Sequence, residues 1–119
     1  MVLNKLKSND FKCLRENGKT FKTPNFLFVY KKKEHSEAKN TLNVGFTITK
    51  KVGKACLRNK IRRRLRESVR DLSNLLESNP LSFDDLNLNI VVLQKKPETL
   101  VYSNVHEQVQ HFFKNRILN

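Results

Sequence analysis

The chain is poor in the residues on which several classes of protein depend. It has no tryptophan, and it has only three glycines and two cysteines among its 119 residues. Cys13 and Cys56 lie far apart and form no CxxC motif, which favours reduced thiols over a disulfide or a nucleophile. Both occur where an apolar residue would fit, so we expect small buried thiols.

Long hydrophobic runs are also missing. The longest apolar runs, 26–30 and 90–93, are far shorter than the ~20 residues of a membrane-spanning helix. The opening MVLNKLKSND has no apolar segment of the signal-peptide type, and the chain ends without a lipidation motif. We therefore expect a cytoplasmic protein without a membrane partner.

Catalytic motifs are not recognisable either. The segment 106–111, HEQVQH, resembles the HExxH zinc motif, but its second histidine comes one residue late. On a helix the two imidazoles would point about 140° apart. The glycines form neither a P-loop nor a dinucleotide fingerprint, and the adjacent Asp84 and Asp85 are expected in a loop or a cap. We expect no catalytic residue, no metal site and no cofactor bound by this chain.

Positive charge is what the chain has in excess. It carries 24 Lys and Arg against 11 Asp and Glu, a formal net charge of +13. The stretch 50–70, KKVGKACLRNKIRRRLRESVR, holds ten bases and one acid, so +9 of this charge lies in about one sixth of the length. Such density repels itself, and its usual reason is a polyanionic partner. Nucleic acid is the first expectation and an anionic membrane the second.

The second half of this basic stretch has the pattern of an amphipathic helix. At 100° per residue from Arg58 on, one stripe collects the apolar residues Ile61, Leu65, Val69, Leu72 and Leu76. The opposite side collects Asn59, Arg62, Arg63, Arg66 and Arg70. A solvated charged face is the ordinary interpretation, but the Glu–Lys pairs that neutralise a surface helix are nearly absent. We interpret this side as a surface for phosphates, which suit guanidinium groups.

Helices and strands alternate along the chain. We expect a helix over residues 6–18, capped by Ser8 or Asn9 and closed by Gly18. An extended or turning lead-in over 19–24 precedes a strand over 25–31, which a polar loop joins to an alternating strand over 42–49. These two strands are expected to form a long antiparallel hairpin. The basic helix, a loop, a strand and a final helix follow, over 58–77, 78–85, 86–93 and 102–118.

This order predicts a single RNA-binding domain over residues 1–119. The expected fold is α+β, a two-layer sandwich of order αβββαβα or close to it. The basic helix crosses between the strands 42–49 and 86–93, which are parallel if the crossover spans the sheet. The final helix, capped by Ser103 or Asn104, is expected to turn Val105, Val109, Phe112 and Phe113 inward. The aromatic residues Phe11, Phe21, Phe26, Phe28, Tyr30 and Phe46 fit either a core or a cleft in which unpaired bases stack.

Residues 47–70, TITKKVGKACLRNKIRRRLRESVR, resemble the signature of the bacterial ribonuclease P protein subunit. The family pattern is roughly hydroxyl-x-K-K-x-G-x-A-x-x-R-N-x-x-(K/R)-R-x-x-R-E. It is met by Thr47 or Thr49 and then by Lys50-Lys51, Gly53, Ala55, Arg58-Asn59, Arg62-Arg63 and Arg66-Glu67. The resemblance extends more loosely over nearly the whole chain, through Asp10-Phe11, Gly18, Phe26 and Lys95-Lys96-Pro97.

This resemblance implies a small basic cofactor of a catalytic RNA. The two together remove the 5′ leader of precursor tRNA, and the RNA subunit carries the catalysis with magnesium ions. The implied partners are this RNA and the precursor tRNA, without an obligate protein partner. The family fold also implies a left-handed crossover through the basic helix, against the general right-handed rule.

The resemblance also assigns two sets of residues. The surface for the RNA subunit comprises Lys50, Lys51, Lys54, Arg58, Asn59, Arg62, Arg63, Arg66 and Arg70. The cleft for the single-stranded leader lies between the first helix and the sheet and contains Phe11, Leu27, Val29 and Thr47. Positions Arg15 and Val29 are aromatic in some relatives, so leader stacking is expected to be weaker here or moved to other residues.

Two other functions remain open from the residues. A binding module of another sort, such as a ribosomal protein or an RNA chaperone, would bind RNA without assisting any cleavage. A self-sufficient metal nuclease is disfavoured because no carboxylate cluster is visible.

Overall fold

The computed structural model describes residues 2–32, 41–77, 85–93 and 101–117, with side chains for 3–32, 41–72, 85–93 and 101–117. The expected α+β class is confirmed, and the order αβββαβα follows a first short strand. The elements are β1 (Val2–Lys5), α1 (Ser8–Asn17), β2 (Lys19–Lys22), β3 (Phe26–Lys32), β4 (Thr41–Thr47), the 3₁₀ turn η1 (Lys50–Val52), α2 (Ala55–Glu77), β5 (Leu86–Val92), α3 (Tyr102–Phe112) and the π-helical turn η3 (Phe113–Ile117).

One five-stranded sheet has the order β1-β4-β5-β3-β2. The parallel strands β4 and β5 are neighbours joined through α2, so the expected crossover is confirmed. The hairpin prediction was wrong, because β5 lies between β3 and β4 and pairs antiparallel with β3. The mostly apolar β5 is buried along most of its length, and a central strand of this kind requires a partner on each side.

Of the two outer strands, β1 was not predicted, and β2 was predicted only through the expected order αβββαβα. β2 pairs antiparallel with β3 and supplies the third strand of that order, in a segment whose residues were described as an extended or turning lead-in. β1 pairs in parallel with β4, from Val2 beside Thr41 to Lys5 beside Val44. Both have four residues, include lysines and are mostly exposed where described, as is common for edge strands. Such segments carry too little alternation to be recognised from sequence.

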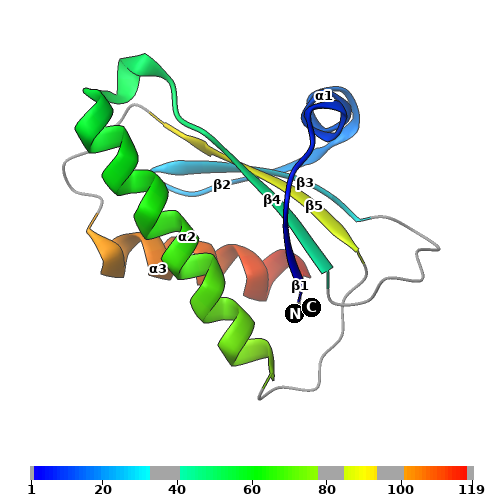
Figure 1. The fold of residues 1–119 in the computed structure, drawn as a ribbon. Coiled ribbons are helices and arrows are strands. Elements are labelled where there is room, and N and C mark those ends of the chain that lie inside the picture. Colours follow the sequence, from blue (N-terminus) through cyan, green and yellow to red (C-terminus); the bar gives the residue numbers. More distant parts are fainter. Residues whose placement is uncertain (1, 33–40, 78–84, 94–100, 118–119) are drawn as a thin grey trace.

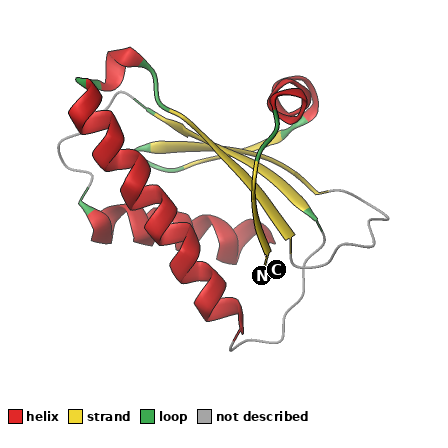
Figure 2. Ribbon diagram, viewed as in Figure 1, coloured by secondary structure: helices red, strands yellow, loops and turns green. Residues whose placement is uncertain are grey.

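Helices lie on both faces of the sheet, with α2 and α3 on one side and α1 on the other (Figures 1 and 2). The main core lies between the sheet and the α2–α3 layer. As predicted, the apolar stripe of α2 is buried at Ile61, Leu65, Val69 and Leu72, and α3 with η3 buries Val105, Val109, Phe112 and Phe113. The predicted inward position of Leu76 lies outside the described side chains.

The predicted helix caps were wrong. Lys7 and Val101 occupy the cap positions of α1 and α3, and neither side chain caps its helix. The backbone carbonyl of Lys7 accepts hydrogen bonds from the N–H groups of Asp10 and Phe11 instead. The prediction for the other end of α1 is confirmed, since Gly18 closes it by donating its N–H to the carbonyl of Leu14 at 2.8 Å.

The cysteines and the start of the basic helix also differ from expectation. Both cysteines are free, but Cys13 is half-buried and Cys56 is exposed, so the prediction of buried thiols was wrong. α2 begins at Ala55, three residues before Arg58. Cys56 therefore lies in the first turn of the helix, ahead of the stripe of core residues that begins at Ile61.

Candidate nucleic-acid interface

A glycine shapes the entrance to the basic helix. Gly53 has a φ of +155°, in the region that favours glycine, and an added Cβ would lie 2.8 Å from Cδ2 of Leu57. The Arg58 Nε–H donates to the Gly53 carbonyl at 3.2 Å. This tight connection places the exposed Lys50, Lys51 and Lys54 directly before α2. The Arg58 side chain therefore stabilises the turn at Gly53 that precedes α2.

The signature residues do not form one uniform face of α2. Asn59, Arg63, Arg66 and Arg70 are exposed, whereas Arg58 and Arg62 are half-buried. The Arg62 Nη1–H donates to Oδ1 of Asn59 at 3.3 Å. Arg62, Arg66 and Arg70 line a common cavity, but Arg63 is not part of its lining. The predicted RNA-binding residues of α2 therefore do not all share one surface. Arg62, Arg66 and Arg70 line the cavity, and the other predicted residues of α2 lie outside its lining.

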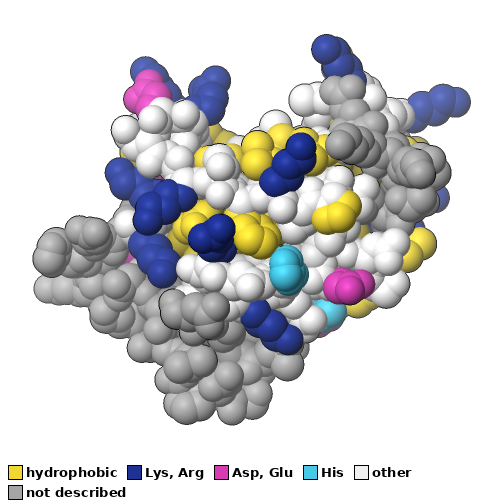
Figure 3. All heavy atoms as spheres, turned by 180° about the vertical axis from the view of Figure 1, so that it is seen from behind, with side chains coloured by type: hydrophobic (Ala, Val, Ile, Leu, Met, Phe, Trp, Pro, Cys, Tyr) yellow, Lys and Arg dark blue, Asp and Glu magenta, His cyan; other side chains and the backbone are white. Residues whose placement is uncertain are grey.

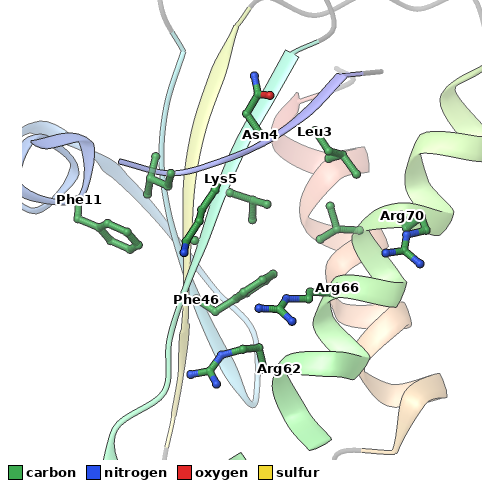
Figure 4. A pocket seen from close by; sticks show the side chains of 12 residues that line it. Leu3, Asn4, Lys5, Phe11, Phe46, Arg62, Arg66 and Arg70 are labelled. Atoms are coloured by element: carbon green, nitrogen blue, oxygen red, sulfur yellow. The ribbon is translucent and has the colours of Figure 1, made fainter. Parts of the chain in front are cut away.

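This cavity, the edge groove, has a volume of about 560 Å³ and lies between α2 and the edge of the sheet. Arg62, Arg66 and Arg70 form its α2 wall, and their side chains extend toward the sheet in Figure 4. The sheet side is formed by β1 and β4, and Phe11 of α1 lies at its other end. The groove thereby connects α2 with the side of the sheet that carries α1.

The four predicted cleft residues lie together on this α1 side of the sheet. The register places Thr47, Val91 and Leu27 in one cross-strand row and Gly45, Asn89 and Val29 in the next. All of them except Gly45 are half-exposed. Phe11 extends over Gly45 from α1. The structure therefore brings Phe11, Leu27, Val29 and Thr47 to one surface.

Two residues in these rows, Asn89 and Val91, were missed by the sequence analysis. The Thr47 hydroxyl donates to Oδ1 of Asn89 at 3.0 Å. This hydrogen bond orients the Asn89 amide so that its NH₂ group is turned away from Thr47, and such a group can pair with a base edge. The alternation of β5 marked Asn89 as polar, but only the strand order places it beside Val29 and Gly45.

Gly45 permits the contact between α1 and the sheet. An added Cβ would lie 2.2 Å from Cζ of Phe11. We expect Gly45→Ala to displace the Phe11 ring and to cost about 1–3 kcal/mol in free energy of unfolding. The measurement is urea denaturation of Gly45→Ala, Phe11→Ala and the double variant.

The double variant provides the control. Since Phe11→Ala removes the obstructing ring, the added cost of Gly45→Ala should largely disappear in that background. Equal costs of Gly45→Ala in both backgrounds would contradict the contact.

A polar network extends the α1 face at the start of β5. The Asn43 Nδ2–H₂ group donates to Asp85 at 2.8 Å and to Asn87 at 2.9 Å. Asp85 and Asn87 are 8% and 6% exposed. Asp85, which was expected in a loop or cap, thus anchors the strand entrance. The adjacent Asp84 lies outside the described residues.

The histidines of the HEQVQH segment take part in structural contacts. His106 Nδ1 lies 2.9 Å from the hydroxyl of Ser68, which is fully buried between α2 and α3. Tyr102 stacks on His106 and donates its hydroxyl to Asp71. This hydrogen bond, with smaller contributions from burial and nearby carboxylates, raises the pKa of Tyr102 to about 12. A serine buried in this way is not accessible as a nucleophile.

Within the residues that the structure describes, no group of three or more His, Cys, Asp or Glu side chains is arranged to hold a metal ion. None of the described helices has the length and apolar character needed to cross a membrane. On the face seen in Figure 3, Lys and Arg side chains form several separate groups between hydrophobic and uncharged surface. Positive charge therefore also occurs away from the basic helix.

The fold is that of the ribonuclease P proteins. The structure of the Staphylococcus aureus protein matches with a TM-score of 0.73 at 20% identity, over 100% of this chain and 99% of that chain. The Thermotoga maritima protein matches with a TM-score of 0.73 at 20% identity, over 94% of this chain and 96% of that chain.

The chain belongs to the ribonuclease P protein family, whose model, described as Ribonuclease P, matches residues 4–116. The ribonuclease P protein component of Bacillus cereus (strain Q1) is 29% identical over 113 residues, 93% of this chain and 89% of that protein. The component of Streptococcus pneumoniae serotype 4 is 30% identical over 108 residues, 91% of this chain and 79% of that protein. The predicted resemblance is confirmed, and membership implies a role in tRNA 5′ processing as part of a ribonuclease holoenzyme.

Proposed function

We propose that this protein is the cofactor of a catalytic RNA that removes the 5′ leader of precursor tRNA. The observation that supports the proposal is that a chain of this family has a basic surface on one helix and a group of partly exposed residues on the α1 face of the sheet. The signature cations lie along η1 and α2, and the four predicted cleft residues converge on the α1 face.

In this function η1 and α2 bind the RNA subunit. Lys50, Lys51 and Lys54 contact phosphates before the helix, and Arg62, Arg66 and Arg70 do so along it. Guanidinium groups suit this task because their N–H groups match pairs of phosphate oxygens. Arg58 has a second task, since it holds the Gly53 turn, and Asn59 orients Arg62.

The cleft on the α1 face binds the unpaired leader. Phe11 offers the ring on which a base can stack, and Leu27, Val29 and Val91 offer apolar surface beside it. The Thr47–Asn89 pair offers an amide for a base edge. Catalysis and the magnesium ions belong to the RNA subunit, and this chain contributes binding and positioning in the cytoplasm.

A reconstitution tests this function. Precursor tRNA is incubated at low magnesium with the protein alone, with the cognate catalytic RNA alone, and with both. We expect cleavage at the mature 5′ end to be fastest with both, because the basic protein offsets repulsion between two RNA molecules. The measurement is the single-turnover rate, with mature tRNA as a competitor that lacks the leader.

The other outcomes separate the alternative functions. Binding without faster cleavage would indicate a general RNA-binding module such as a ribosomal protein or an RNA chaperone. Cleavage by the protein alone would indicate a self-sufficient nuclease. Either result would contradict the proposal.

A further inference from the structure

The edge groove contains a cation that lies outside the family signature. Lys5 is the last residue of β1 and pairs with Val44 of β4. Both residues line the groove. In Figure 4 the Lys5 side chain points into the groove toward Phe46. Arg62 and Arg66 approach Phe46 from the α2 side. Cations from β1 and from α2 therefore line the groove on either side of Phe46.

The end of β1 creates this hollow. Pairing between β1 and β4 stops at Lys5 and Val44, and the Leu6 N–H then donates to the Val44 carbonyl at 3.1 Å. The chain leaves the sheet there and begins α1 at Ser8. Among the described strands, none lies beside Gly45–Thr47 on this side of β4. The open edge is flanked by Phe11 on one side and by α2 on the other.

The chemistry of the lining fits a nucleic acid. The cations Lys5, Arg62, Arg66 and Arg70 line the groove together with an apolar surface that includes Leu3 and Phe46, and no acidic residue is among the described residues that line it. Lys5, Arg66 and Arg70 are exposed, so they remain accessible to a ligand. Phosphate groups pair with such cations, while bases and riboses pack on apolar and aromatic surface. The volume of about 560 Å³ is within the ~300–1,000 Å³ typical of ligand sites.

We propose that the edge groove binds a segment of unpaired RNA, with Lys5 on a phosphodiester and Phe46 against a base or ribose. This inference rests on the proposed function and extends it. The groove joins Phe11 of the leader cleft to the arginines of α2, so a strand held there crosses the edge of β4 between the two surfaces. An acidic peptide is less suited, because an open edge of three residues is too short to pair with an added strand.

A short oligonucleotide tests the groove in the full-length protein. The probe is a fluorescent ten-nucleotide oligouridylate, and its affinity is measured by anisotropy from 0.05 to 0.3 M salt. We expect Lys5→Ala to lower the log–log salt slope by about 0.7, since one phosphate contact is lost, which corresponds to about fivefold weaker binding at 0.1 M salt. Lys5→Arg should retain the affinity. Thermal unfolding of each variant establishes that the fold is unchanged.

Lys19 provides the matched control. It is an exposed lysine on β2, the edge strand at the opposite side of the sheet, and it does not line the groove. Lys19→Ala removes the same charge and should leave the affinity unchanged. Equal effects of Lys5→Ala and Lys19→Ala, or no effect of either, would overturn the proposal. Weaker binding of a ten-residue glutamate peptide to Lys5→Ala, with RNA binding unaffected, would assign the groove to an acidic peptide instead.

Cross-linking identifies which RNA occupies the groove. Lys5→Cys in a Cys13→Ser, Cys56→Ser background carries a photoreactive group in the assembled complex with RNA subunit and precursor tRNA. A cross-link to the leader or to the RNA subunit names the source of the segment, and a cross-link to neither contradicts the site. These results are independent of the reconstitution, because lost stimulation of cleavage and lost oligonucleotide binding are separate measurements.

Discussion

Replacing Arg62 and Arg66 together by glutamate is expected to prevent assembly with the catalytic RNA at physiological salt. The two side chains extend from α2 toward the sheet and line the edge groove together with Phe46. Loss of two phosphate contacts alone weakens binding to a duplex by about thirtyfold at 0.15 M salt. The added carboxylates then repel the RNA, so the total effect is larger. A filter-binding titration of the protein with the RNA subunit measures it.

Single substitutions and a charge-matched control make this prediction specific. Arg62→Ala and Arg66→Ala should each lower the log–log salt slope by about one, as expected for a single phosphate contact. Lys19→Glu combined with Lys114→Glu changes the net charge equally, but these exposed residues lie on β2 and η3. This control should weaken binding far less. Unchanged slopes for the alanine variants would remove both arginines from the interface.

The second large effect concerns the aromatic core that supports the sheet. Phe28 of β3 and Phe112 of α3 are both fully buried, and their rings stack with centroids 4.5 Å apart and an interplanar angle of 4°. Phe112→Ala is expected to reduce the free energy of unfolding by about 3–5 kcal/mol, because a large cavity remains between sheet and helix. This is a major part of the ~5–15 kcal/mol available to a small domain.

Urea denaturation followed by circular dichroism measures this loss. Phe21→Ala is the matched comparison, since its ring lies 5.8 Å from that of Phe112 but is only half-buried. We expect a clearly smaller loss for Phe21→Ala and an unchanged m-value for both variants. A loss below about 1 kcal/mol for Phe112→Ala would contradict its role in the core.

Local patterns explain which elements were predictable. The stripe of Ile61, Leu65 and Val69 repeats over several turns, and all three residues are at most 1% exposed in the structure. A long periodic pattern of this kind predicts the buried face of a helix reliably, because the apolar stripe must be buried wherever the helix packs. The caps at Lys7 and Val101 were missed because backbone groups replace the side-chain oxygen that defines a cap in sequence.

The site was predicted unevenly. The cations of η1 and α2 were found because they are dense and spaced at three and four residues. The cleft residues Phe11, Leu27, Val29 and Thr47 came from the family resemblance, and the strand register now places them on one surface. Asn89 and Lys5 were missed, because neither is unusual in its own segment. Their position depends on which strand lies beside them.

The sequence by itself determined a basic, mixed α+β chain of the ribonuclease P protein family, with +9 of its net charge of +13 in the stretch 50–70 that leads into and forms one amphipathic helix. These properties are local or additive, so they can be read from composition, periodicity and motif spacing. Only the tertiary structure decided that β5 separates β3 from β4 and that β1 ends at Lys5. Strand order depends on pairing between distant segments, which no local pattern encodes. Because β1 ends at Lys5, the edge of β4 stays open beyond it, and the groove lies there between Arg62, Arg66 and Arg70 of α2 and Phe11.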